Sequence, residues 1–176
     1  MRALILTGPP AVGKSTIGRF VAQDRPCAAF IDVDDVRHLV VSGHAAPWNG
    51  LEGLRQQQLG VLNACALARN FLDGDVDVVI VDVLTDSTAE LYRARLTEVL
   101  IVKLEADFGE TERRAESRPV HLTPEEFREL HDQQHDFTGC DIRLDVTRLS
   151  AQDAAAQVKD IWLSDRGREG NARPRA

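Results

Sequence analysis

A glycine-rich segment near the amino end constrains this chain most strongly. Residues 8–15 read Gly-Pro-Pro-Ala-Val-Gly-Lys-Ser and match the pattern G-x-x-x-x-G-K-[S/T]. The apolar run at 3–7 predicts a buried strand before this segment, and residues 14–23 have the period of a helix after it. A strand, a glycine loop and a helix in this order form a cradle of backbone N–H groups that holds phosphates. The sequence therefore predicts a nucleotide-binding α/β fold.

The residues of this phosphate loop have different expected roles. We expect the ε-ammonium group of Lys14 to reach the β- and γ-phosphates of ATP, and the Ser15 hydroxyl to ligate Mg²⁺. Thr16 is expected near the α-phosphate. The expected cofactors are ATP and Mg²⁺, and the nucleotide-binding positions in the loop are Gly8, Pro10, Ala11, Val12, Gly13, Lys14, Ser15 and Thr16.

Strand-length apolar runs alternate with longer segments of helical period along the rest of the chain. Strands are expected at 3–7, 28–33, 76–83, 99–104 and 142–146, and helices at 14–23, 51–71, 88–95, 110–117 and 151–163. This alternation is typical of a parallel sheet with helices on both faces. We expect one domain at 1–163, a small mobile lid at about 119–137, and a disordered tail at 164–176.

Composition limits the classes of partner. A formal charge of −7 and a pI near 5.2 argue against nucleic-acid binding, which needs a surplus of Lys and Arg. The apolar runs are shorter than the roughly 18 residues of a membrane helix, and the amino end does not resemble a signal peptide. The three cysteines are far apart and are expected as buried thiols. We therefore expect a cytoplasmic protein without nucleic-acid or membrane partners, of undetermined oligomeric state.

Carboxylates follow the second expected strand. Asp32, Asp34 and Asp35 lie at its carboxyl end, where ligands bind in open α/β sheets. Alternation along an extended strand would place Asp32 and Asp34 on the same side. Asp34 is the preferred base for an acceptor hydroxyl, although Asp34 or Asp35 would also serve as a helix cap. Arg37 would neutralise an anionic acceptor or hold a carboxylate.

The third expected strand ends in another carboxylate, Asp82. An acidic residue after the apolar run 78–81 has the character of a Walker-B position, which binds Mg²⁺ through water. Ser15 and Asp82 are therefore the expected metal ligands.

The segment after Arg37 is expected to contact the acceptor. His44 and Trp48 would line a pocket for a compound with several hydroxyls, although Trp48 would equally suit a core or a hinge. The expected acceptor-binding residues are Asp32, Asp35, Arg37, His44 and Trp48.

Arginines after the fourth expected strand suit the charge of a transferred phosphoryl group. Arg114 and Arg118 are four residues apart and share one helix face. A lid that carries Arg118 would bring positive charge to the site as water is excluded. The alternative is a solvated face that balances the neighbouring glutamates.

These residues together resemble the small P-loop kinases, which include gluconate kinase, shikimate kinase, adenylylsulfate kinase, chloramphenicol phosphotransferase and the zeta toxins. Residues 32–37 are similar to the Asp-Gly-Asp-x-x-Arg element of adenylylsulfate kinases, and Asp34 matches the acceptor-side aspartate of the toxin and antibiotic kinases. Residues 114–121 resemble the lid of gluconate kinases, which implies Arg114 near the adenine and Arg118 near the phosphates. Residues 145–147 resemble the segment that passes the adenine, which implies a nucleotide contact for Thr147.

The resemblance implies a five-stranded parallel sheet in the order 2-3-1-4-5. It also implies transfer of the γ-phosphoryl group of ATP to a hydroxyl of a sugar, sugar acid, antibiotic or nucleotide, with Lys14, Asp34 and Arg118 as catalytic residues. Residues 37–44 do not reproduce the His, Asn and Lys constellation of gluconate kinases, so the acceptor stays open. The alternatives are an ATPase or GTPase switch and a nucleotide-binding module without turnover, although the sequence lacks the Asn-Lys-x-Asp guanine signature.

Overall fold

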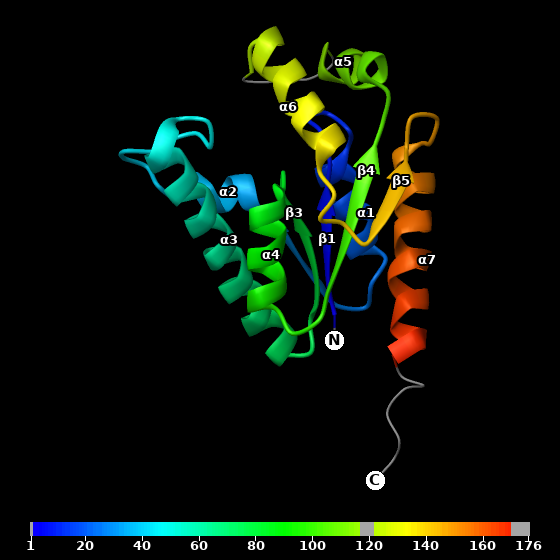
Figure 1. The fold of residues 1–176 in the computed structure, drawn as a ribbon. Coiled ribbons are helices and arrows are strands. Elements are labelled where there is room, and N and C mark those ends of the chain that lie inside the picture. The colour runs from blue at the N-terminus through cyan, green and yellow to red at the C-terminus, as the bar shows by residue number, and fades with distance from the viewer. Residues whose placement is uncertain (1, 117–121, 170–176) are drawn as a thin grey trace.

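Five parallel strands form the centre of the molecule. The computed structural model describes residues 2–116 and 122–169. The sheet has the order β2-β3-β1-β4-β5, which confirms the expected topology (Figure 1). The strands are β1 (Ala3–Thr7), β2 (Ala28–Asp32), β3 (Asp77–Val81), β4 (Val99–Glu105) and β5 (Ile142–Asp145).

Helices cover both faces of the sheet. The helices are α1 (Lys14–Gln23), α2 (Val33–Arg37), α3 (Gly50–Asp73), α4 (Asp86–Arg95), α5 (Phe108–Glu116), α6 (Pro124–Asp136) and α7 (Ala151–Glu169). Figure 1 shows α3 and α4 on one face, α1 and α7 on the other, and α5 and α6 beyond the carboxyl ends of the strands. No helix among the described residues combines the length and the apolar character of a membrane span.

Alternation along the central strand divides the core into two apolar clusters. Ala3 and Ile5 of β1 pack in the cluster beneath α3 and α4, whereas Leu4 and Leu6 pack in the cluster beneath α1 and α7. Trp162 of α7 is fully buried in this second cluster. Because both faces of the strand are buried, the sheet offers ligands only its edges and its ends.

Two segments differ from the sequence expectations. The expected lid contains α6, whose Phe127 and Gln134 are buried together with the following Phe137. Phe127 and Gln134 are seven residues apart and lie on one face of α6, so this face is buried. Movement of the segment as a lid stays a prediction. The last helix continues to Glu169 instead of ending at Leu163, so the expected disordered tail begins as helix.

Candidate active site

The phosphate loop combines left-handed backbone with close packing. The φ angles of Gly8, Ala11 and Gly13 are 138°, 57° and 108°. A Cβ atom on Gly8 would lie 2.2 Å from the carbonyl oxygen of Leu104, so only glycine fits where the loop passes β4. Successive residues with such mixed handedness turn their N–H groups towards one concavity, which is an anion-binding geometry.

The side chain of Lys14 lies against this loop. Its ammonium group donates to the carbonyl oxygens of Gly8 and Pro9 at 2.8 and 2.9 Å. Gly13 is the N-cap of α1, so the positive end of the helix dipole faces the same concavity. The loop, the ammonium group and the helix end therefore form one positive cradle for phosphates.

The hydroxyl of Ser15 is paired with the carboxylate at the end of β2. Ser15 Oγ donates to Asp32 Oδ2 at 2.9 Å. Burial raises the pKa of Asp32, and the hydrogen bond from Ser15 opposes that rise. No group of three or more His, Cys, Asp or Glu side chains suited to a metal occurs among residues 2–116 and 122–169. A hydroxyl and a carboxylate beside a phosphate cradle nevertheless fit Mg²⁺, which takes few protein oxygens together with phosphate and water.

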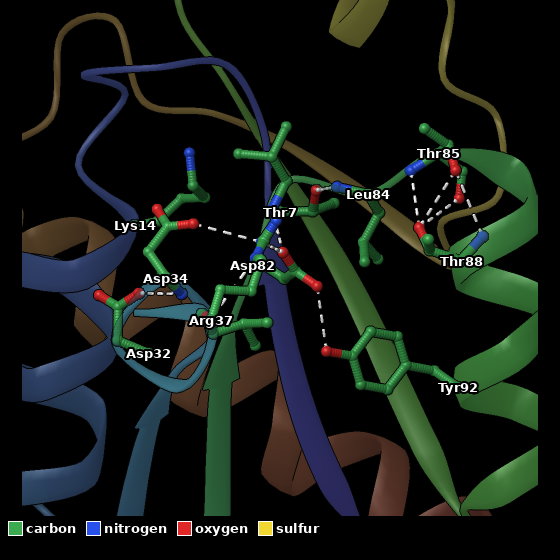
Figure 2. A network of polar contacts seen from close by, with 12 residues as sticks. Thr7, Lys14, Asp32, Asp34, Arg37, Asp82, Leu84, Thr85, Thr88 and Tyr92 are labelled. Atoms are coloured by element: carbon green, nitrogen blue, oxygen red, sulfur yellow. Dashed lines mark hydrogen bonds and ion pairs between the residues drawn. The ribbon is translucent and has the colours of Figure 1, made fainter. Parts of the chain in front are cut away.

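Asp82 has different surroundings from those expected of a metal ligand. Its Oδ1 accepts from Arg37 Nη2 at 2.5 Å and from the Val83 amide at 2.8 Å, and its Oδ2 accepts from the Tyr92 hydroxyl at 3.1 Å (Figure 2). The Asp82 side chain is only 1% exposed. Ser15 therefore pairs with Asp32, whereas protein donors already engage both oxygens of Asp82. The expected role of Asp82 as a ligand of Mg²⁺ stays a prediction.

Arg37 joins the buried carboxylate to an exposed one. Its Nη2 lies 3.2 Å from Asp34 Oδ1 as well as beside Asp82 (Figure 2). The side chain of Asp34 is 69% exposed, whereas that of Arg37 is only 9% exposed. A Cβ atom on Gly60 of α3 would lie 2.8 Å from Arg37 Cγ, so the absence of a side chain there makes room for the arginine. Of the two roles considered for Arg37, the structure shows the one that holds carboxylates.

The acidic segment is helical after its first residue. Asp32 ends β2 and caps α2, because its Oδ1 accepts from the Asp34 amide at 3.2 Å. The alternation argument for Asp32 and Asp34 was therefore wrong, since Asp34 belongs to a helix. The capping alternative also named the wrong residue, because neither Asp34 nor Asp35 is the cap. Asp34 and Asp35 are both exposed at the start of α2.

Arg114 connects the phosphate loop to two other segments. Its Nη1 donates to the Val12 carbonyl at 3.0 Å, and its Nη2 donates to the Val146 carbonyl at 3.1 Å. Its Nε donates to Glu110 at 2.7 Å, and hydrogen bonds from Arg113 and Arg114 lower the pKa of Glu110 to about 2. The guanidinium group thus fixes the loop against α5 and the segment after β5.

Thr147 lies in that same segment. Its hydroxyl donates to Asp145 Oδ1 at 2.6 Å and accepts from the Asp107 amide at 3.1 Å. The structure therefore joins one expected nucleotide-binding position, Arg114, to the phosphate loop, and the carbonyl oxygen of the other, Thr147, accepts from Arg114 Nη2 at 3.4 Å. Arg118 lies outside the described residues.

Sequence reasoning missed the residues that attach α6 to the sheet. Gln134 donates to the Leu84 carbonyl at 2.7 Å, and the Thr7 hydroxyl accepts from the Leu84 amide at 3.0 Å. Buried Lys103 of β4 donates to the carbonyl oxygens of His135 and Phe137 at the end of α6, at 3.2 and 3.3 Å. A lysine inside the apolar run 99–104 was the signal available in the sequence.

The expected acceptor residues His44 and Trp48 are both exposed. Trp48 is 50% exposed, which argues against a position for this aromatic residue in the core. Gln56 anchors the loop before α3, because its side chain donates to the Gly43 carbonyl at 2.8 Å and accepts from the Ala45 amide at 2.9 Å. The loop is therefore fixed while its aromatic side chain faces outwards.

Comparisons with known proteins identify solved structures of similar fold. No protein-family model and no curated protein matches the sequence. Among solved structures, an unliganded sugar kinase from Janibacter sp. aligns with a TM-score of 0.67 at 17% identity over 93% of each chain. Shikimate kinase from Acinetobacter baumannii in complex with shikimate aligns with a TM-score of 0.67 at 18% identity over 94% of each chain. The tunicamycin resistance protein of Deinococcus radiodurans has a TM-score of 0.67 at 12% identity over 92% of this chain and 96% of that one.

The chain has the fold of the small P-loop kinases. In this P-loop kinase fold, the cradle of residues 8–15 and the carboxylates at the ends of β2 and β3 meet at one end of the sheet. Positive charge lies on the loop side of that end, and exposed carboxylates lie on the α2 side. Such an arrangement suits a phosphoryl donor on one side and a hydroxyl group on the other.

Proposed function

We propose that this protein transfers the γ-phosphoryl group of ATP to a hydroxyl group of a small molecule, with the help of Mg²⁺. The observation that carries the proposal is the hydrogen bond between Ser15 and Asp32 beside a phosphate loop with left-handed residues. A loop that only turned the chain would need neither the paired hydroxyl and carboxylate nor the ammonium group of Lys14 at the same place. The sugar-kinase and shikimate-kinase neighbours support this class of reaction.

On the donor side, ATP would be bound by backbone N–H groups and by Lys14, and Arg114 would support the loop. The N–H groups of the loop and the ammonium group of Lys14 bind the phosphates, and Arg114 keeps the loop in position through the Val12 carbonyl. Ser15 and Asp32 would hold Mg²⁺. When bound, the ion neutralises charge on the phosphate oxygens. Arg118 remains a proposed partner of the transferred group.

Asp34 is the proposed base on the acceptor side. The acceptor hydroxyl oxygen forms a new bond to the γ-phosphorus, the bond to the β–γ bridging oxygen breaks, and Asp34 takes the hydroxyl proton. Its exposure leaves one carboxylate face open to an acceptor, and Arg37 fixes its orientation. Asp82 and Tyr92 act through Arg37 and are positioning residues.

The test is ADP release from ATP and Mg²⁺, measured with and without a panel of hydroxylated metabolites and antibiotics. A kinase releases ADP in proportion to the acceptor added, and Asp34→Asn abolishes that dependence while ATP still binds in calorimetry. ADP release that no acceptor changes would instead identify an ATPase switch. ATP binding without turnover would identify a binding module, for which Asp34→Asn changes nothing.

A further inference from the structure

The charges beside the proposed base restrict the kind of acceptor that fits. We define the acceptor segment as residues 33–60, which comprises α2, the following loop and the first turns of α3. Figure 1 shows α2 and this loop at the end of the sheet that also carries α6, on the opposite side from β5. The segment is described without a gap, so the partners of its arginines can be assigned.

The two arginines of the acceptor segment are both held by carboxylates. Arg37 is buried between Asp82 and Asp34. Arg55 forms a two-pronged pair with Glu52, with N–O distances of 2.9 and 2.8 Å, and hydrogen bonds from Arg55 and Gln56 lower the pKa of Glu52 to about 2. The segment contains no lysine.

Recognition of a carboxylate or phosphate normally uses an arginine fork aimed at the ligand. Within the acceptor segment, both guanidinium groups are already paired with protein carboxylates, and Asp34 and Asp35 are exposed. An anionic acceptor would therefore meet exposed negative charge next to the proposed base. The local charge favours an acceptor without negative charge.

The same segment exposes a group of large apolar side chains. The exposed fractions are 75% for Leu39, 93% for Val41, 50% for Trp48, 88% for Leu51 and 51% for Leu54. Single apolar residues are normal on a surface, but these five all lie within residues 39–54, and such a concentration suits a binding surface.

The fold holds the loop that carries Leu39, Val41 and Trp48, and Leu51 and Leu54 lie at the start of α3. Gln56, which is 6% exposed, bonds to Gly43 and Ala45. A Cβ atom on Gly53 would lie 2.0 Å from the Ala46 carbonyl oxygen, so the loop lies directly on α3. The apolar side chains of this loop are therefore exposed although the loop itself is held in place.

We propose that the acceptor is a hydroxyl compound without negative charge that carries an alkyl or aryl group. This inference rests on the kinase function proposed above. The hydroxyl group meets Asp34, and the apolar group packs on Trp48, Leu51 and their apolar neighbours in the acceptor segment. Burial of the acceptor's apolar group against these side chains supplies binding affinity, which the arginines do not supply because they are paired with protein carboxylates.

The first test uses matched sets of candidate acceptors. Each set contains an anionic compound, an uncharged compound without an apolar group, and an uncharged compound with one, for example D-gluconate, D-glucose and phenyl β-D-glucopyranoside. Acceptor-dependent ADP release is measured across sets built on many polyol scaffolds. We expect turnover with members of the third class.

The outcomes separate the two proposals. Turnover confined to anionic compounds or to compounds without an apolar group overturns the acceptor class. ATP binding without turnover of any third-class compound also overturns it. Absence of ATP binding in calorimetry overturns the kinase function itself.

The second test uses the accepted compound and two variants. Trp48→Ala and Leu51→Ser should each raise its KM about tenfold, with kcat and the KM of ATP unchanged. Leu67→Ser is the control, because Leu67 is 40% exposed on α3 and lies about 24 Å along the helix from Leu51. If neither substitution changes the KM of the accepted compound, the proposed contact of its apolar group with Trp48 and Leu51 is overturned.

Tryptophan fluorescence gives a readout that does not depend on turnover. The sequence contains two tryptophans, of which Trp162 is fully buried and Trp48 is half exposed. Binding of the accepted compound should shift the emission of Trp48 to shorter wavelength, and Trp48→Phe should remove the shift. An unchanged emission at saturating acceptor overturns the contact with Trp48.

Discussion

The donor side and the acceptor side of the site are built in different ways. On the donor side, Arg114 joins segments far apart in the sequence, because it donates to the carbonyl oxygens of Val12 and Val146. On the acceptor side, the loop is held mainly by Gln56, which bonds to a carbonyl only 13 residues away. The difference shows that the nucleotide cradle depends on the whole fold, whereas the acceptor loop can change with little effect on the rest.

The largest expected effect is on the donor side. Lys14→Ala should reduce kcat about 1,000-fold, because the γ-phosphoryl group loses its closest positive partner. Steady-state kinetics gives kcat, and circular dichroism checks that the fold is unchanged. Full activity in this variant would remove Lys14 from the mechanism and leave the donor cradle without its central group.

The next two effects distinguish the roles of Asp82, which follows β3, and Asp32, which ends β2. Asp82→Asn should lower the free energy of unfolding by about 3 kcal/mol, because it leaves Arg37 buried without its ionised partner. Asp32→Asn should leave stability nearly unchanged but weaken the dependence of activity on Mg²⁺. Urea denaturation and Mg²⁺ titration of activity measure the two effects.

Tyr92→Phe provides the matched control for this pair of variants. It removes one hydrogen bond to Asp82 and should cost about 1 kcal/mol without a change in Mg²⁺ dependence. If Asp82→Asn weakened Mg²⁺ binding and spared stability, Asp82 would be the metal ligand after all.

A smaller effect is expected where the nucleotide base would lie. Arg114→Met should raise the KM of ATP about tenfold, because the loop loses charge-assisted bonds to its Val12 carbonyl. The KM of the acceptor should stay the same if the two sides are built independently. A parallel rise in both constants would show that the two sides are coupled.

The smallest effect lies in the core beneath α3. Burial raises the pKa of the Cys65 thiol to about 11 from its ordinary value of 9.0. The folded chain therefore binds more protons than the unfolded chain between about pH 9 and 11. Stability from this thiol is complete below pH 9 and falls as the pH rises through that range.

Urea denaturation of wild type and Cys65→Ala between pH 8 and 11 measures this contribution. The variant should show a shallower loss of stability with pH. Cys27→Ala should behave as wild type because Cys27 is exposed, so the expectation of three buried thiols was wrong for this cysteine. Equal slopes in all three proteins would contradict a buried neutral thiol at position 65.

Much of the fold could be predicted because its signals are local. The alternating apolar runs and the loop at 8–15 predicted the sheet and the first helix, and the family resemblance supplied the strand order. β1 and α1 have the expected bounds, since a glycine loop marks the boundary between them.

The partners of the carboxylates could not be predicted in the same way. The sequence shows that two strands end in aspartate, but not which one meets Ser15. That choice is made in three dimensions: α2 begins at Val33 and turns Arg37 inwards over Gly60, where it meets Asp82. The attachment of α6 by Gln134 also depends on contacts across 50 residues, which periodicity does not reveal.

The double attachment of Arg37 has a consequence for how such a protein can evolve. One guanidinium group touches both the exposed Asp34 and the buried Asp82, so a change at position 37 would disturb chemistry and folding together. Residues 39–51 have no comparable double role in chemistry and folding, because most of their side chains face solvent. New acceptor preferences are therefore expected to arise by substitutions in this loop while the arginine and its two carboxylates stay constant.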